Sequence, residues 1–235
     1  MGRVFEKRKH TMFARFDKMS KTFTKFGKEI AMAVKAAGPD PDTNAKLRVV
    51  IANAKSANMP KDRIEAAIKR SSNKDTSNYE EVNYEAMCMK GVGLIIETAT
   101  DNPTRTVANI RMYLNRGGGE LSKSGSLDFA FERKSIFIIN TDHVNTEELE
   151  FELIDAGLED IEIEGNEMVL TASFENFGNM QKALEFKGLN IVSAELQRLP
   201  TSLVQLNEEE KQLVEKLIEK LEEDDDVQNV YSNMA

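Results

Sequence analysis

Lysine and arginine are the side chains of this sequence best suited to chemistry with a partner, and they are concentrated at one end of the chain. Residues 1–74 contain 18 Lys and Arg against 7 Asp and Glu, whereas residues 75–235 contain 13 against 33. The two segments have net charges of +11 and −20, which the overall charge of −9 conceals. This asymmetry predicts that the basic segment contacts nucleic acid or another anionic surface.

The cations of the basic segment have the type and density that phosphate binding requires. Lysine and arginine neutralise phosphates and release counterions, an attraction that weakens as salt rises. The alternative is a solvated helix face, although such faces usually mix both signs of charge. We predict phosphate contacts from Lys7, Arg8, Lys9, Arg15, Lys18, Lys21, Lys25, Lys28, Lys46, Arg48, Lys55, Lys61, Arg63, Lys69 and Arg70.

Other kinds of chemistry have weaker support. His10 and His143 lie in no catalytic or metal-binding motif, and Cys88 has no recognisable base nearby in the sequence. Glycines 117–119 follow a predicted helix, which favours a helix end over a phosphate-binding loop. The acidic run 222–226 lacks the spaced ligands and the glycine of a calcium loop, so a solvated helix end is predicted there. We therefore predict a protein that is not an enzyme and that uses no metal and no cofactor.

Apolar residues at helical spacing position the cations of the basic segment. Phe23, Phe26 and Ile30 predict one helix, with the lysines on a different face and the phenylalanines in the core. A break at 38–42 precedes a second helix, and a third is expected from Pro60. A polar linker over 71–78 ends the segment.

Beyond residue 78 the pattern changes to strands alternating with helices. Strands are predicted at 92–100, 127–131, 136–139, 161–163, 168–172, 191–196, 202–206 and 227–231. Helices are predicted at 103–115, 146–156, 177–186 and 208–223. Within this series, 133–199 is a complete β-α-β-β-α-β unit, the ferredoxin-like pattern. We predict an α+β protein with a basic helical domain at 1–78, a discontinuous ferredoxin-like domain at 79–132 and 200–235, and an inserted ferredoxin-like domain at 133–199.

Several segments resemble the YebC/PmpR family across nearly the whole chain. The most specific are 57–62 (ANMPKD), 97–102 (ETATDN), 131–134 (FERK) and 225–231 (DDVQNVY). The sequence departs from the family at its opening residues 2–10 and at 84–89, where the usual glycines and proline are missing. The resemblance implies a helical domain followed by two ferredoxin-like domains, the third inserted in the second.

The resemblance also implies a cytoplasmic regulator of gene expression. DNA-binding transcriptional regulation is the first hypothesis, and a ribosome-associated translation factor that binds ribosomal RNA and relieves stalling is the alternative. In either case residues 1–74 are expected to contact the nucleic acid, and the acidic domains are expected to be repelled by it or to contact proteins or the ribosome. An enzyme in the α/β part is a third hypothesis, which a closed pocket with a perturbed carboxylate would favour. The single cysteine and the short apolar runs predict a cytoplasmic protein without a membrane partner.

Overall fold

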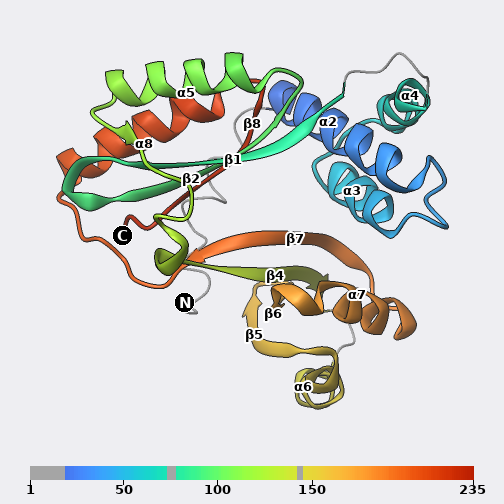
Figure 1. Ribbon diagram of the computed structural model, residues 1–235. Helices are drawn as coiled ribbons and strands as arrows, with labels where there is room; N and C mark the ends of the chain where they lie inside the picture. The colour runs from blue at the N-terminus through green and yellow to red at the C-terminus, as the bar shows by residue number, and fades with distance from the viewer. Residues whose placement is uncertain (1–18, 73–77, 142–144) are drawn as a thin grey trace.

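The computed structural model describes residues 19–72, 78–141 and 145–235, which form a helical part and two antiparallel sheets (Figure 1). This arrangement confirms the predicted α+β class, whereas the predicted domain limits stay a prediction. None of the described helices is long and apolar enough to cross a membrane. The helical part consists of α2 (Met19–Ala37), α3 (Ala45–Ser56) and α4 (Lys61–Ser71).

The helical part forms because three amphipathic segments share one apolar core. Ile30 of α2, Leu47 of α3 and Ile64 of α4 are almost fully buried in it. Asn44 fixes the turn between α2 and α3. Its Oδ1 accepts the backbone N–H of Leu47 at 3.0 Å, and its Nδ2 donates to the carbonyl oxygen of Ala33 at 2.8 Å. The predicted helices of this part are therefore confirmed, with an N-cap that joins two of them.

The first sheet has the strand order β3-β1-β2-β8, with all neighbours antiparallel. Its strands are β1 (Glu80–Met87), β2 (Gly93–Thr100), β3 (Glu120–Leu121) and β8 (Val227–Ser232). Two helices, α5 (Pro103–Arg116) and α8 (Glu208–Glu222), cover one face of this sheet (Figure 1). Asn102 caps α5, and Gly117 ends it, which confirms the helix end predicted at the glycines 117–119.

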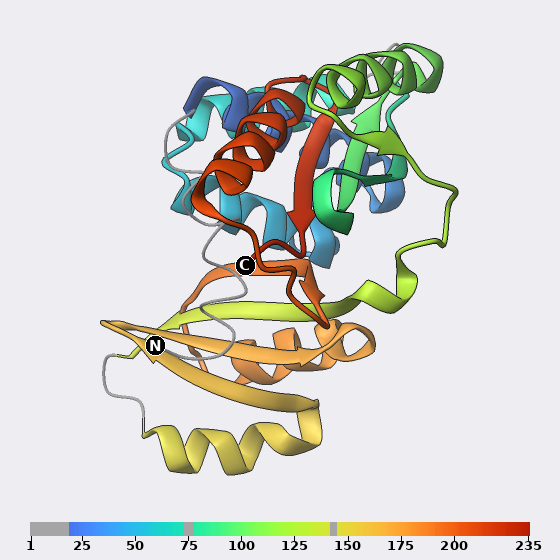
Figure 2. The ribbon, with the colours of Figure 1, turned by 90° about the vertical axis from the view of Figure 1, so that its left-hand side faces the viewer.

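The second sheet has the order β5-β6-β4-β7 and is also antiparallel. Its strands are β4 (Phe131–Asn140), β5 (Leu158–Glu164), β6 (Glu167–Ser173) and β7 (Ile191–Pro200). Their core face packs against α6 (Thr146–Leu153) and α7 (Phe177–Phe186). All four strands come between β3 and β8 in the chain, so the second sheet interrupts the first in sequence. Figure 2 shows the second sheet below the first.

Two predicted strands are wrong and two observed strands were not predicted. Residues 127–131 contain a 3₁₀ turn at Asp128–Ala130, because Leu127 and Ala130 pack under the open face of the first sheet instead of pairing with a neighbour. Residues 202–206 form no strand, and Val204 makes only an isolated bridge to Met234. The unpredicted strands are β1 and β3.

A glycine at the end of the turn after α6 provides a test of this packing. Gly157 has φ +95°, and a Cβ built on it would lie 2.6 Å from the Cβ of Asn176. Gly188 has φ +68° with nothing within 4 Å of such a Cβ. We expect Gly188→Ala to cost about 1 kcal/mol through backbone strain alone and Gly157→Ala to cost about 3 kcal/mol, because the backbone must also move. Urea unfolding of both variants measures the difference, and equal losses would contradict the clash.

Candidate nucleic-acid interface

Three of the four lysines of α2 bind within the protein, and only Lys35, near the end of the helix, is exposed. The Nζ of Lys21 donates to the carbonyl oxygen of Glu223 at 2.9 Å, and the Nζ of Lys25 donates to that of Gln228 at 3.0 Å. Glu223 is the C-cap of α8, so its carbonyl lies where the helix dipole is negative. Lys21 and Lys25 therefore contact the acidic part of the chain around the end of α8 and β8.

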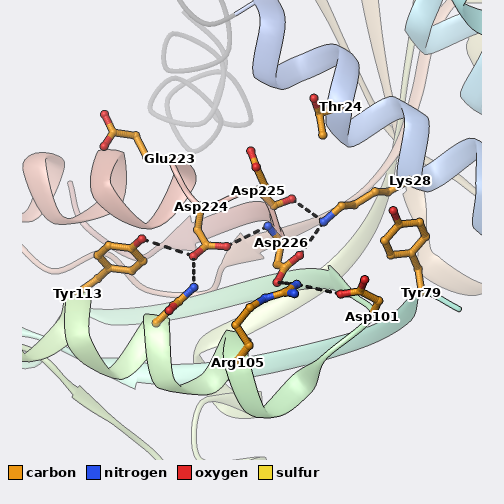
Figure 3. A pocket seen from close by; sticks show the side chains of 11 residues that line it. Thr24, Lys28, Tyr79, Asp101, Arg105, Tyr113, Glu223, Asp224, Asp225 and Asp226 are labelled. Atoms are coloured by element: carbon orange, nitrogen blue, oxygen red, sulfur yellow. Dashed lines mark hydrogen bonds and ion pairs between the residues drawn. The ribbon is translucent and has the colours of Figure 1, made fainter. Parts of the chain in front are cut away.

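Lys28 is buried and lies at the centre of this contact (Figure 3). Its Nζ donates to the carbonyl oxygens of Ala99 at 3.0 Å and Asp225 at 2.8 Å, and to Oδ1 of Asp226 at 2.7 Å. These three acceptors satisfy all three ammonium protons. The prediction that Lys28 contacts phosphate is thus wrong, because the protein's own carboxylate and carbonyls take the place of a phosphate. For Lys21 and Lys25, phosphate contact stays a prediction.

Asp226 receives a hydrogen bond on both of its oxygens. Besides Lys28 on Oδ1, its Oδ2 accepts from Arg105 at 2.6 Å, Thr106 at 2.8 Å and Thr100 at 3.2 Å. Burial alone would raise the pKa of Asp226, but the hydrogen bonds from Lys28, Arg105 and Thr106 outweigh it and hold the pKa at about 2. Asp226 is therefore ionised at neutral pH and is held by hydrogen bonds to both of its oxygens.

Asp224 stabilises the acidic turn at residues 223–226, which joins α8 to β8 and contains Asp226. Its Oδ1 accepts the backbone N–H of Asp226 at 2.9 Å, and its Oδ2 accepts from Asn109 at 2.9 Å and from the hydroxyl of Tyr113 at 3.4 Å (Figure 3). Asp224 and Asp226 are 9% and 4% exposed. The prediction of a solvated helix end at 222–226 is therefore wrong for these two aspartates, although Asp225 is exposed.

A polar cavity of about 510 Å³ opens between α2, α5 and this turn, and Figure 3 shows its lining side chains. A perturbed carboxylate in a cavity is the feature that would favour an enzyme, and Asp226 is such a group. Its pKa is lowered, however, so it is ionised and has no proton to give, and both of its oxygens already accept hydrogen bonds from the protein. Cys88 is also poorly suited to catalysis, because burial raises the pKa of its thiol to about 11. Among the described residues, no group of three or more His, Cys, Asp or Glu is placed to hold a metal ion.

A second contact joins the helical part to the inserted sheet. Asn53 of α3 exchanges two hydrogen bonds with the backbone of Ala194 in β7, at 2.8 and 3.0 Å. Arg48 on the same helix lies 3.5 Å from the carboxylate of Glu185 and donates to the carbonyl oxygen of Pro41. The helical part is thereby held against both sheets.

The other predicted cations differ in whether they have an acidic neighbour. Lys46 pairs with Glu81 at 3.0 Å, and Lys61 pairs with Glu65 at 3.6 Å, both on the exposed surface. Arg63 lies over the ring of Phe23, 6.0 Å from its centroid. Lys55, Lys69 and Arg70 are exposed and form no salt bridge with any other described residue. Lys7, Arg8, Lys9, Arg15 and Lys18 lie outside the described residues.

Family models match both the helical part of the chain and the part that contains the two sheets. The model of the TACO1/YebC N-terminal domain matches residues 3–74, and the model of the TACO1/YebC second and third domains matches residues 79–234. The chain belongs to the TACO1/YebC family. This finding confirms the resemblance that the sequence motifs indicate.

Relatives of the TACO1/YebC family span the full length of the chain. A protein of Cytophaga hutchinsonii is 51% identical over 235 residues, which is 100% of this chain and 99% of that protein. One of Flavobacterium johnsoniae is 50% identical over 234 residues, again 100% of this chain and 99% of the relative. Both are named probable transcriptional regulatory proteins.

A solved structure has a fold similar to that of this chain. The crystal structure of Aq1575, a conserved hypothetical protein of Aquifex aeolicus, is similar with a TM-score of 0.79 and 36% identity. The match covers 94% of this chain and 93% of that one.

The buried ion pair between Lys28 and Asp226 predicts a large and asymmetric effect of substitution. Asp226→Asn leaves the buried ammonium without its counter-ion, so we expect a loss of about 3–5 kcal/mol in the free energy of unfolding. In the double variant Lys28→Met/Asp226→Asn the loss should be smaller than the sum of the two single losses by about 1–3 kcal/mol. Urea unfolding measures all three. Lys46→Met, which breaks an exposed pair, is the control, with an expected change below about 1 kcal/mol.

Acid should weaken the same contact within a defined range of pH. The pKa of Asp226 falls from 3.8 to about 2 on folding. Because the folded pKa is the lower one, its contribution of about 2 kcal/mol is complete above the unfolded value and is lost as pH falls towards the folded one. The free energy of unfolding, measured from pH 5 downwards, should therefore fall less steeply in Asp226→Asn than in the unaltered protein. Parallel curves would contradict the assignment.

Proposed function

We propose that this chain regulates gene expression by binding the phosphate backbone of duplex DNA through exposed cations of its helical part. The observation that supports the proposal is the exposure of Lys55, Lys69 and Arg70, which have no acidic partner among the described residues. The names of the relatives, probable transcriptional regulatory proteins, support regulation of transcription as the biological setting. The attraction is electrostatic and independent of base sequence.

The placement of these cations supports backbone contact more than base reading. Lys55 lies in the last turn of α3, and Lys69 and Arg70 lie in the last turn of α4. Base reading in the major groove instead uses several side chains along one inserted helix. Phosphates are common to DNA and RNA, so the same placement supports a second candidate function, in which the chain is a ribosome-associated translation factor that binds ribosomal RNA.

Neutralising two of these cations tests the proposed function. For Lys69→Gln/Arg70→Gln we expect weaker binding to a labelled DNA duplex, with the slope of log affinity against log salt concentration reduced in magnitude by about 2, because two phosphate contacts are lost. Fluorescence anisotropy between about 50 and 200 mM salt measures this slope. The matched control is Lys182→Gln/Lys216→Gln, which removes two exposed lysines from α7 and α8 and should leave the slope unchanged.

Two outcomes would contradict the proposed function or redirect it. An unchanged slope in Lys69→Gln/Arg70→Gln would refute phosphate binding by these side chains. Co-sedimentation with ribosomes, together with no preference for any duplex over random competitor, would replace transcriptional regulation by the second candidate function.

A further inference from the structure

The helix α5 differs in charge from the acidic segment 75–235 to which it belongs. Its 14 residues include Arg105, Arg111 and Arg116 and no Asp or Glu. The neighbouring helix α8 packs on the same sheet and carries six Glu and three Lys in 15 residues. A helix with cations only, within a segment of net charge −20, is not the mixed face that solvation alone produces.

One of the three arginines is already used inside the protein. Arg105 binds Oδ2 of Asp226 at 2.6 Å and Oδ1 of Asp101 at 2.9 Å. Arg111 and Arg116 are exposed, and within the described part of the chain neither side chain forms an ion pair or a hydrogen bond. Arg116 lies in the last turn, where the helix dipole favours a cation, but Arg111 lies too far from the helix end for that explanation.

The spacing of Arg111 and Arg116 leaves an uncharged strip between them. At 3.6 residues per turn, the two arginines lie on opposite sides of the helix face that points away from the sheet. A step of five residues separates them by about 7.5 Å along the helix axis. Ala108, Met112 and Asn115 occupy the strip between them and are all exposed. A phosphate backbone lying along this strip would therefore meet a guanidinium from each side, and guanidinium groups bind phosphate with two parallel hydrogen bonds.

The position of α5 in the molecule fits the same ligand as the helical part. Figures 1 and 2 both show α5 along the upper side of the molecule, and Figure 1 shows α4 at the same level beyond α2. DNA is stiff over distances far longer than one small protein, with a persistence length of about 150 base pairs, so a straight duplex across this side can meet both helices.

We propose that the outward face of α5, through Arg111 and Arg116, is a second phosphate-binding surface for the duplex DNA. The inference rests on the proposed function and extends it to the acidic part of the chain. The acidic domains are then not simply repelled by the polyanion, because α5 provides a local cationic contact. An acidic protein and ribosomal RNA are the other ligands that the test distinguishes.

The experiment compares Arg111→Gln/Arg116→Gln with Arg111→Lys/Arg116→Lys in the full chain, using a labelled DNA duplex. For the glutamine variant we expect a loss of affinity of at least tenfold at about 50 mM salt and a salt slope reduced in magnitude by about 2. The lysine variant keeps the charge and should retain the slope. Combining the glutamine changes with Lys69→Gln/Arg70→Gln should reduce the slope by about 4 in total.

The outcomes separate this inference from the function on which it rests. If Arg111→Gln/Arg116→Gln binds as the unaltered protein does while Lys69→Gln/Arg70→Gln is weakened, the α5 surface is refuted and the proposed function survives. If neither variant is weakened, both fail. If Arg111→Gln/Arg116→Gln co-sediments less with ribosomes but keeps its duplex affinity, the surface binds ribosomal RNA. If the variant binds both nucleic acids as the unaltered protein does, an acidic protein is left as the ligand. Each of these two results overturns the inference.

A second measurement needs no substitution and remains decisive if the glutamine variant folds poorly. Phenylglyoxal modifies exposed arginines, and bound duplex should slow the modification of Arg111 and Arg116 in the unaltered protein. Arg133, which is exposed on β4 and stacks 3.6 Å from the ring centroid of Phe174, is the reference side chain. Equal modification rates with and without duplex at Arg111 and Arg116 would overturn the proposal.

Discussion

The arrangement of this protein depends on one buried ion pair, between Lys28 in the basic segment and Asp226 near the end of the chain. Removing two charges from water costs several kcal/mol per ion, and only close pairing with further hydrogen bonds offsets that cost. Both groups have this pairing, since each meets three or more partners. The orientation of the helical part relative to the first sheet is therefore fixed by a polar contact that tolerates little displacement.

This contact changes the meaning of the charge asymmetry in the sequence. A basic segment beside an acidic one indicates an external polyanion, yet part of the positive charge neutralises the protein's own acidic turn. Lys21, Lys25 and Lys28 all donate to residues between Ala99 and Gln228 that belong to the first sheet or to the end of α8. The exposed cations that we propose to meet a partner lie farther along the chain, on α3, α4 and α5.

Much of the fold could be predicted from local patterns, and the failures have local causes. Helical spacing predicted the helices because each buries one continuous apolar stripe. Strand β1 was missed because three Glu and an Asn obscure its inward residues, although Val82, Tyr84 and Ala86 do alternate as a half-buried strand should. Strand β3 has two residues and therefore no period to detect.

The site was harder to predict than the fold because its decisive contacts are distant in sequence. Lys28 and Asp226 are 198 residues apart, and no pattern within a helix reveals which lysine of several will be buried. Opposite charges at the two ends of the chain were a visible signal, but composition alone does not distinguish a partner inside the molecule from one outside it.

The central position of β2 in the first sheet affects the order in which the molecule can assemble during synthesis. Strand β2 (residues 93–100) pairs with β1 on one side and on the other with β8, which follows it in the chain by more than 120 residues. Until synthesis has passed residue 232, one edge of β2 stays unpaired and the acidic turn before β8 is incomplete or has no strand to follow it. The cationic helix α2 is synthesised long before the turn that binds it, so the nascent chain passes through a stage in which Lys28 has no internal counter-ion.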